Sequence, residues 1–150
     1  MGEAATLLVV EDNAHDVFLL KRAFIKAGIN VPMHIVNDGQ EAVDYLTGQE
    51  PYANRKEYPL PTLLLLDLKM PRLSGFDVIR WVREHKGLRR LPILVLSSSG
   101  LGKDVNRAYD LGANSYLLKP SRFEDLEVLA EDVERYWCQR NRGPESLDAD

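Results

Sequence analysis

Four short apolar runs, each followed at once by polar side chains, constrain the fold of this chain more than any other feature. Runs this short and this uniformly apolar are typical of parallel strands that are covered on both faces. In an open parallel sheet, ligands bind outside the carboxyl ends of the strands. The sequence therefore predicts that three carboxylates, a hydroxyl and an ammonium group meet at one edge of a sheet. The runs are Leu7–Val10 before Glu11 and Asp12, Leu63–Leu66 before Asp67, Ile93–Leu96 before Ser97, and Tyr116–Leu118 before Lys119.

Segments with helical periodicity separate these runs. Apolar side chains recur at helical spacing in five segments, which are 16–27, 42–46, 76–82, 105–111 and 123–138. The segment Met33–Val36 predicts one more strand, and Gly28 and Gly112 stand where helix ends are expected. The alternation of five strands with five helices predicts one α/β domain with a doubly wound parallel sheet and right-handed crossovers.

Length and composition are those of a soluble protein with one domain. A chain of 150 residues can bury roughly 68–70% of the surface that its unfolded form exposes. The single cysteine, Cys138, cannot form an internal disulfide, and no early segment resembles a signal peptide. No apolar run approaches the roughly 20 residues that a membrane-spanning helix needs. We therefore expect a cytoplasmic protein that does not enter the membrane.

Charge gives little indication of nucleic-acid binding. The formal net charge of −4 is mild, and the one basic group lacks interleaved aromatic residues and any motif that enters a groove. We interpret that group as a solvated helix face and turn. It consists of Arg80, Arg83, Lys86, Arg89 and Arg90.

The polar groups at the strand ends suit phosphoryl transfer that depends on a metal ion. Carboxylates at short range oppose one another's ionisation, and a divalent cation relieves that conflict. Oxygen ligands favour Mg²⁺ or Mn²⁺, whereas zinc would require His or Cys, and neither is placed at these strand ends. Because Pro120 holds the residue before it extended, the ammonium group of Lys119 is directed along its strand. Asp67 could then attack a phosphoryl group in line, while the metal ion and Lys119 neutralise the transferring oxygens.

These residues together resemble the receiver domain of two-component response regulators, over about residues 5–138. The matching motifs are Glu11-Asp12, Asp67-Leu68-Lys69-Met70-Pro71 with Gly75, Ser97, and Tyr116-Leu117-Leu118-Lys119-Pro120. The resemblance implies a flavodoxin-like (βα)5 fold with strand order 2-1-3-4-5. It also implies that Asp67 is the phospho-acceptor, that Ser97 hydrogen-bonds the phosphoryl group and that Lys119 pairs with it. Tyr116 matches an aromatic residue whose rotamer is coupled to movement of the Ser97 hydroxyl.

The resemblance also implies how Mg²⁺ or Mn²⁺ is bound. The ligands would be Asp12, Asp67 and the backbone carbonyl of Lys69, with Glu11 acting through water. Glu11 stands where aspartate is also frequent in this family, and we expect metal binding to survive the longer side chain. Lys69 and Ser99 occupy positions whose side chains can influence the hydrolytic water in receivers, so the lifetime of the phosphorylated state is not predicted from the sequence.

The chain ends soon after the predicted fifth helix, which leads us to expect a stand-alone receiver without a DNA-binding or enzymatic output domain. We expect one domain over residues 1–150, with a core at about 5–138 and a polar tail at 139–150 that frays. The segment 47–61 contains three prolines and little periodicity, so we expect a long loop that is functional or mobile. Together with the Leu-Ser-Ser-Ser stretch at 96–99, this loop resembles small regulators that are paired with phytochrome-type histidine kinases.

In regulators of that kind the output is protein contact, and homodimers often form through the last helices. Here Phe123, Tyr136 and Trp137 offer more aromatic area than a single inward stripe would use. The sequence leaves two interpretations open, a dimer surface that contains these rings or a core that contains all three.

Three other classes of function fit the residues less well. Phosphohydrolases that form an aspartyl phosphate usually carry a second acid two residues beyond the nucleophile, where this chain has Lys69. A degenerate receiver that serves as a binding adaptor would not need the complete site. Nucleotide binding of the Rossmann or P-loop type would require a glycine-rich loop where Glu11–Ala14 stands. We therefore expect a signalling protein that promotes only its own phosphorylation and dephosphorylation, with a sensor histidine kinase as its partner.

Overall fold

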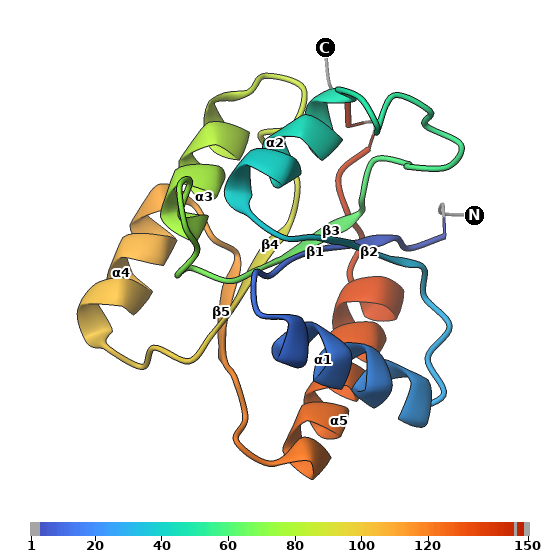
Figure 1. Ribbon diagram of the computed structural model, residues 1–150, viewed down its shortest axis with the longest axis vertical. Helices are drawn as coiled ribbons and strands as arrows, with labels where there is room; N and C mark the ends of the chain where they lie inside the picture. Colours follow the sequence, from blue (N-terminus) through green and yellow to red (C-terminus); the bar gives the residue numbers. More distant parts are fainter. Residues whose placement is uncertain (1–3, 146, 149–150) are drawn as a thin grey trace.

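The computed structural model describes residues 4–145 and 147–148. Its centre is a sheet of five parallel strands in the order β2-β1-β3-β4-β5 (Figure 1). This order confirms the predicted flavodoxin-like fold. The strands are β1 Leu7–Val10, β2 Met33–Val36, β3 Leu63–Leu66, β4 Ile93–Ser97 and β5 Ser115–Leu118.

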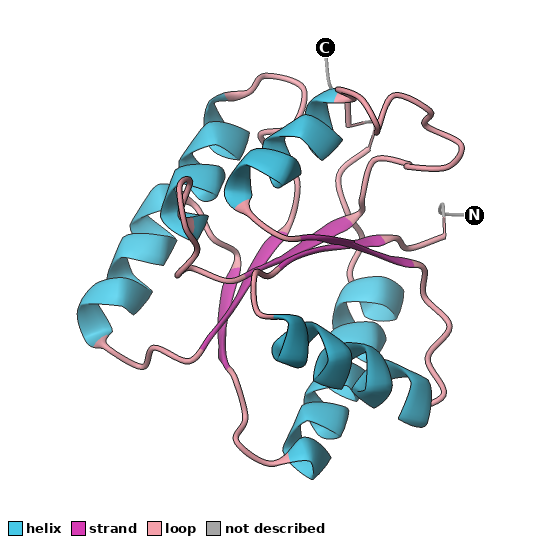
Figure 2. Ribbon diagram, in the orientation of Figure 1, coloured by secondary structure: helices cyan, strands magenta, loops and turns pink. Residues whose placement is uncertain are grey.

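Helices cover both faces of the sheet (Figure 2). Helices α1 and α5 lie on one face, and α2, α3 and α4 lie on the other (Figure 1). Their bounds are α1 Ala14–Lys26, α2 Gly39–Thr47, α3 Gly75–Glu84, α4 Gly102–Leu111 and α5 Phe123–Asp132.

The covering of both faces explains the uniform apolar runs. Along β1, Leu8 and Val10 join the core beneath α2–α4, whereas Leu7 and Val9 join the core beneath α1 and α5. Because successive side chains of a strand point to opposite faces, every position of β1 must be apolar.

Side-chain caps start three of the helices directly after the loops at the carboxyl edge of the sheet. The Asn13 side chain accepts a hydrogen bond from the Asp16 N–H, and this cap starts α1 at Ala14, two residues before the predicted start. The Asp38 side chain caps α2, and Ser74 and Asp77 form a capping box at the start of α3. The polar loop residues are therefore held close to the strand ends.

The last helix changes its geometry partway along. The α-helical part ends at Asp132, and the chain continues as a π-helix over Val133–Arg140, two residues beyond the predicted end. The Asn141 N–H donates to the Tyr136 carbonyl, five residues back, at 2.6 Å.

The loop 47–61 lies at the amino edge of the sheet, because it joins the end of α2 to the start of β3. Its Tyr52 and Tyr58 rings pack against Tyr45 of α2, with ring centroids 5.1 and 5.9 Å apart. The Arg55 guanidinium donates to the Tyr45 carbonyl at 2.8 Å and to the Leu46 carbonyl at 2.9 Å. The loop is therefore anchored to α2 at the edge opposite to Glu11 and Asp67.

Part of the C-terminal tail also returns to the amino edge. Leu147 packs against the core beneath α2–α4, and the Asp148 N–H donates to the Gly87 carbonyl at 2.9 Å. The tail was predicted to fray, but residues 147 and 148 make specific contacts. Residues 146 and 149–150 of the predicted tail lie outside the described part of the chain.

The sequence predicts that Arg83 belongs to a solvated basic face, and the structure contradicts this prediction. Its side chain lies at the end of α3 and donates four hydrogen bonds. The acceptors are the carbonyl oxygens of Gly112, Arg89 and Leu91 at 2.9, 2.8 and 2.7 Å, and Asn114 Oδ1 at 2.9 Å. Local periodicity cannot reveal partners on other elements, so the sequence alone does not distinguish this guanidinium from a surface charge.

Within residues 4–145 and 147–148, none of the helices has the length and apolar character that crossing a membrane requires.

Candidate functional site

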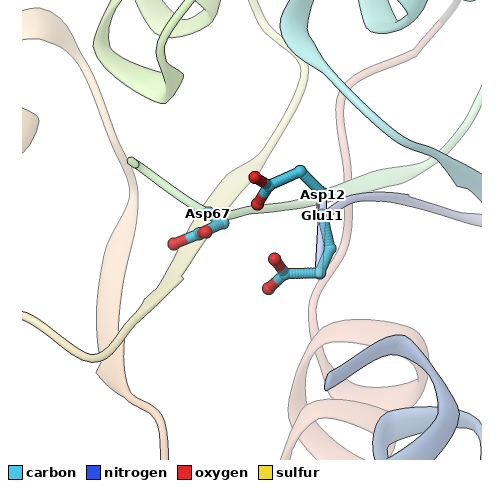
Figure 3. A group of neighbouring side chains, drawn as sticks. All are labelled: Glu11, Asp12 and Asp67. Carbon is cyan, nitrogen blue, oxygen red and sulfur yellow. The ribbon is translucent and has the colours of Figure 1, made fainter. Parts of the chain in front are cut away.

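The structure brings the three predicted carboxylates together. Glu11 and Asp12 follow β1, Asp67 follows β3, and all three side chains extend beyond the strand ends (Figure 3). Carboxylate oxygens of the three residues lie within 4.8 Å of one another. Glu11 and Asp67 are buried, whereas Asp12 is exposed.

Strand register is the reason for this meeting. Val10 of β1 lies opposite Leu66 of β3, and the Asp67 N–H donates to the Val10 carbonyl at 3.0 Å. The residues that follow these two strands therefore emerge side by side, although 56 positions separate Glu11 from Asp67 (67 − 11).

Lys119 reaches the carboxylates from β5. Its backbone N–H donates to the Ser97 carbonyl at 2.8 Å, which continues the pairing of β5 with β4. The Nζ atom lies 2.5 Å from Glu11 Oε1, 3.0 Å from Asp16 Oδ2 and 3.8 Å from Asp67 Oδ2. The ammonium group therefore lies at the carboxylates, as the sequence predicts, and its contact with Asp16 is an addition that the sequence does not indicate.

Burial controls the charges of this cluster. It raises the pKa of Glu11 to about 7, although the hydrogen bond from Lys119 acts in the opposite direction. Burial also raises the pKa of Asp67, against the charge of Lys119 and hydrogen bonds from the Leu68 and Lys69 N–H groups. Burial lowers the pKa of Lys119, but its hydrogen bonds to Glu11 and Asp16 outweigh that effect and leave the pKa raised. Burial thus disfavours the charged forms of Glu11 and Asp67, and a further cation beside them would stabilise those forms.

Ser97 and Tyr116 meet through the backbone of Ser99. The buried Ser97 hydroxyl accepts a hydrogen bond from the Ser99 N–H at 3.1 Å. The Tyr116 hydroxyl donates to the Ser99 carbonyl at 2.8 Å. The Ser99 hydroxyl donates to Asp104 Oδ2 at 2.6 Å, which ties the same loop to the start of α4. A displacement of this loop would therefore change the surroundings of both Ser97 and Tyr116.

Gly75 is required because the start of α3 lies against the backbone of the Asp67 loop. A Cβ atom at position 75 would lie 2.2 Å from the Asp67 carbonyl oxygen, a distance that real side chains do not show. The Gly75 N–H donates to the Leu68 carbonyl at 2.9 Å. This glycine therefore allows α3 to support the loop that carries Asp67, while the Lys69 side chain remains exposed.

A model of the response regulator receiver domain matches residues 7–131. The chain belongs to this family. Phosphoryl acceptance by an aspartate is the function of receiver domains, which are signalling proteins that bind Mg²⁺ or Mn²⁺ in an acidic pocket.

Known relatives cover most of the receiver. A probable methanogenesis regulatory protein, FilR2 of Methanothrix harundinacea, is 38% identical over 138 residues, which cover 92% of this chain and 86% of that protein. Response regulator Rcp1 of Synechocystis sp. is 32% identical over 133 residues, which cover 89% of this chain and 88% of Rcp1.

Solved structures agree with the fold. The Mn²⁺-bound form of Rcp1 matches with a TM-score of 0.82 and 31% identity, covering 93% of this receiver and 99% of that chain. The phosphorylated cyanobacterial phytochrome response regulator RcpA matches with a TM-score of 0.86 and 31% identity. The match covers 95% of this receiver and 100% of the RcpA chain. This receiver is therefore homologous to phytochrome-associated response regulators.

Proposed function

We propose that this receiver takes a phosphoryl group from a sensor histidine kinase onto Asp67 and signals through changed protein contacts. The observation that carries the proposal is the position of the buried Asp67 carboxylate, which lies beside the other acidic residues and 3.8 Å from the Lys119 ammonium nitrogen. A carboxylate can act as the nucleophile in phosphoryl transfer when nearby cations stabilise the transferring oxygens. The receiver unit would comprise about residues 5–138.

We infer that Asp12, Asp67 and the Lys69 backbone carbonyl hold Mg²⁺ or Mn²⁺, with Glu11 contributing through water. The clustered carboxylate oxygens support this inference, because hard divalent cations prefer oxygen ligands. The Mn²⁺-bound form of the homologous Rcp1 supports it as well. When bound, the ion would supply positive charge beside the transferring phosphoryl oxygens.

Asp67, Lys119 and Ser97 would each have a separate role in phosphoryl transfer. An Asp67 oxygen forms the new bond to phosphorus as the bond to the donor breaks, and Lys119 pairs with a phosphoryl oxygen. The Ser97 hydroxyl already accepts a hydrogen bond from the Ser99 N–H. A hydroxyl can still donate its own proton while it accepts, so Ser97 can also hydrogen-bond the phosphoryl group. Movement of Ser97 would then displace Ser99 and change the position of Tyr116, whose hydroxyl donates to the Ser99 carbonyl.

The experiment that tests the proposal is phosphorylation by acetyl phosphate in the presence of Mg²⁺, followed by intact-mass spectrometry. We expect a gain of one phosphoryl group that is stable in acid and lost in base, as an acyl phosphate should be. Removal of the metal ion with a chelator should abolish the gain. Turnover of many equivalents of a phosphate ester would instead support a hydrolase.

We propose a phytochrome-type histidine kinase as the donor, because RcpA is a phytochrome response regulator and matches this receiver over nearly its whole length. The similarity to FilR2, a probable methanogenesis regulator, favours a kinase of another sensory class as the alternative. Phosphotransfer from purified kinases of both classes distinguishes the two partners.

We further propose that the receiver forms a homodimer through the last helices. The three aromatic residues that suggested such a dimer differ in how far they are buried. Phe123 lies beneath the side chains of Arg22 and Lys26 of α1, and Trp137 packs against the adjoining core. Tyr136, in contrast, is 54% exposed. Tyr136 is therefore the aromatic residue that a dimer contact would use.

Replacing Tyr136 with serine is expected to weaken dimerisation by roughly tenfold, because an exposed tyrosine at an interface contributes about 1–2 kcal/mol. Light scattering over a range of protein concentrations, with and without beryllofluoride, measures the effect. Ile25→Ser on α1 is the matched control, because Ile25 is 76% exposed and lies on another helix. A monomer at all concentrations, or equal loss in both variants, would contradict this interface.

A further inference from the structure

A fourth carboxylate, Asp16, contacts the site from α1 and lies outside the three that gather at the strand ends. Its Oδ2 atom is 3.0 Å from Lys119 Nζ, whereas the nearest oxygen of Asp67 is 3.8 Å from the same nitrogen. Glu11 lies closer still, at 2.5 Å. The ammonium group is therefore paired with Glu11 and Asp16 more closely than with the phospho-acceptor.

We propose that Asp16 is a positioning residue that holds Lys119 back from Asp67 until the phosphoryl group arrives. The inference rests on the proposed function, because it assigns Asp16 a role in the response of the same site. The phosphoryl group carries about 1.5 to 2 negative charges and three acceptor oxygens, and it replaces the single charge that Asp67 loses on forming the acyl phosphate. Phosphorylation would thus offer Lys119 a stronger partner than the single charge of Asp16.

Glu11 and Asp16 differ in how unfavourable the loss of their ion pair with Lys119 would be. The Glu11 side chain is 7% exposed, so water has little access to its carboxylate if Lys119 moves away. The Asp16 side chain is 38% exposed, and water can solvate its carboxylate when Lys119 moves. We therefore expect the ion pair between Asp16 and Lys119 to break on phosphorylation and the ion pair between Glu11 and Lys119 to remain.

Asp16 is also held in place by its own helix. Its N–H donates to the capping Asn13 Oδ1 at 3.0 Å, in the first turn of α1. Negative side chains are favoured there because the helix dipole is positive at that end. Asp16 would remain at the start of α1 while Lys119 moves, so it acts as a fixed competitor of the phosphoryl group.

The test measures the binding of beryllofluoride, a phosphoryl mimic, by fluorine NMR at saturating Mg²⁺. We expect Asp16→Asn to bind the mimic about two- to fivefold more tightly than wild type, because a partly exposed ion pair with Lys119 no longer competes. The conservative variant Asp16→Glu retains the charge and should bind like wild type. Unchanged affinity in Asp16→Asn, or equal tightening in Asp16→Glu, would overturn the proposal.

A second background separates contact with Lys119 from the general effect of a nearby negative charge. In Lys119→Met, adding Asp16→Asn should leave the affinity for beryllofluoride unchanged, since no ammonium group remains to be held. Tightening that persists in this background would overturn the proposal. If wild type itself fails to bind beryllofluoride, the proposed phosphorylation of the site fails. If wild type binds and Asp16→Asn has no effect, only the role of Asp16 fails.

Discussion

Replacement of Asp67 by asparagine is expected to abolish phosphorylation by acetyl phosphate, with no mass gain above background. The amide has nearly the shape of the carboxylate, but it has no anionic oxygen to attack phosphorus. The change should not unfold the protein. Burial raises the pKa of Asp67, which means that the fold disfavours the charge that asparagine removes.

The matched control for this prediction is Asp110→Asn, because Asp110 is an exposed aspartate of α4. We expect the control to gain one phosphoryl group as wild type does. Intact-mass spectrometry of the three proteins, before and after brief treatment with base, measures the result. An undiminished gain in Asp67→Asn would place the phosphoryl group on another residue and exclude Asp67 as its acceptor.

Replacement of Arg83 by methionine is expected to lower the free energy of unfolding by about 2–4 kcal/mol. The guanidinium hydrogen-bonds the carbonyls of Gly112, Arg89 and Leu91 and the Asn114 side chain. It thereby joins the end of α3, the connection to β4 and the end of α4. Methionine retains part of the packing but removes the donor to the three carbonyls, whereas Asn114 Oδ1 keeps its hydrogen bond from the Ile93 N–H.

Arg80→Met is the matched control, because Arg80 is an exposed arginine of the same helix. Its free energy of unfolding should change by no more than about 0.5 kcal/mol. Urea unfolding followed by circular dichroism compares both variants with wild type. Similar small losses in the two variants would contradict the structural role of Arg83 and restore the interpretation of a solvated basic face.

Much of the fold follows from patterns that are local in the chain. The run of leucines from Leu63 to Leu66 predicts a strand that is covered on both faces, and β3 has that environment. The helix boundaries were less accurate, because caps and helix geometry depend on individual hydrogen bonds. Asn13 starts α1 two residues early, and the π-helix extends the last helix to Arg140.

In the site, too, the residues that a local pattern marks are predictable and the contacts between distant residues are not. A polar residue at the end of an apolar run is visible in one sequence, so the sequence alone indicates Asp67 and Lys119. Asp16 could not be identified as their neighbour, because in the sequence it is an acidic residue in the first turn of a helix. Such a residue is commonly explained by the helix dipole alone.

The sequence by itself determined the alternation of strands and helices and the polar residues at the strand ends, because those signals repeat within a few residues. Only the tertiary structure decided which partners these residues meet. Lys119 pairs with Asp16 across 103 positions, and Arg83 with Asn114 across 31. Such contacts depend on how distant elements pack against one another. Periodicity indicates which face of an element is buried, but it does not indicate which side chain lies opposite.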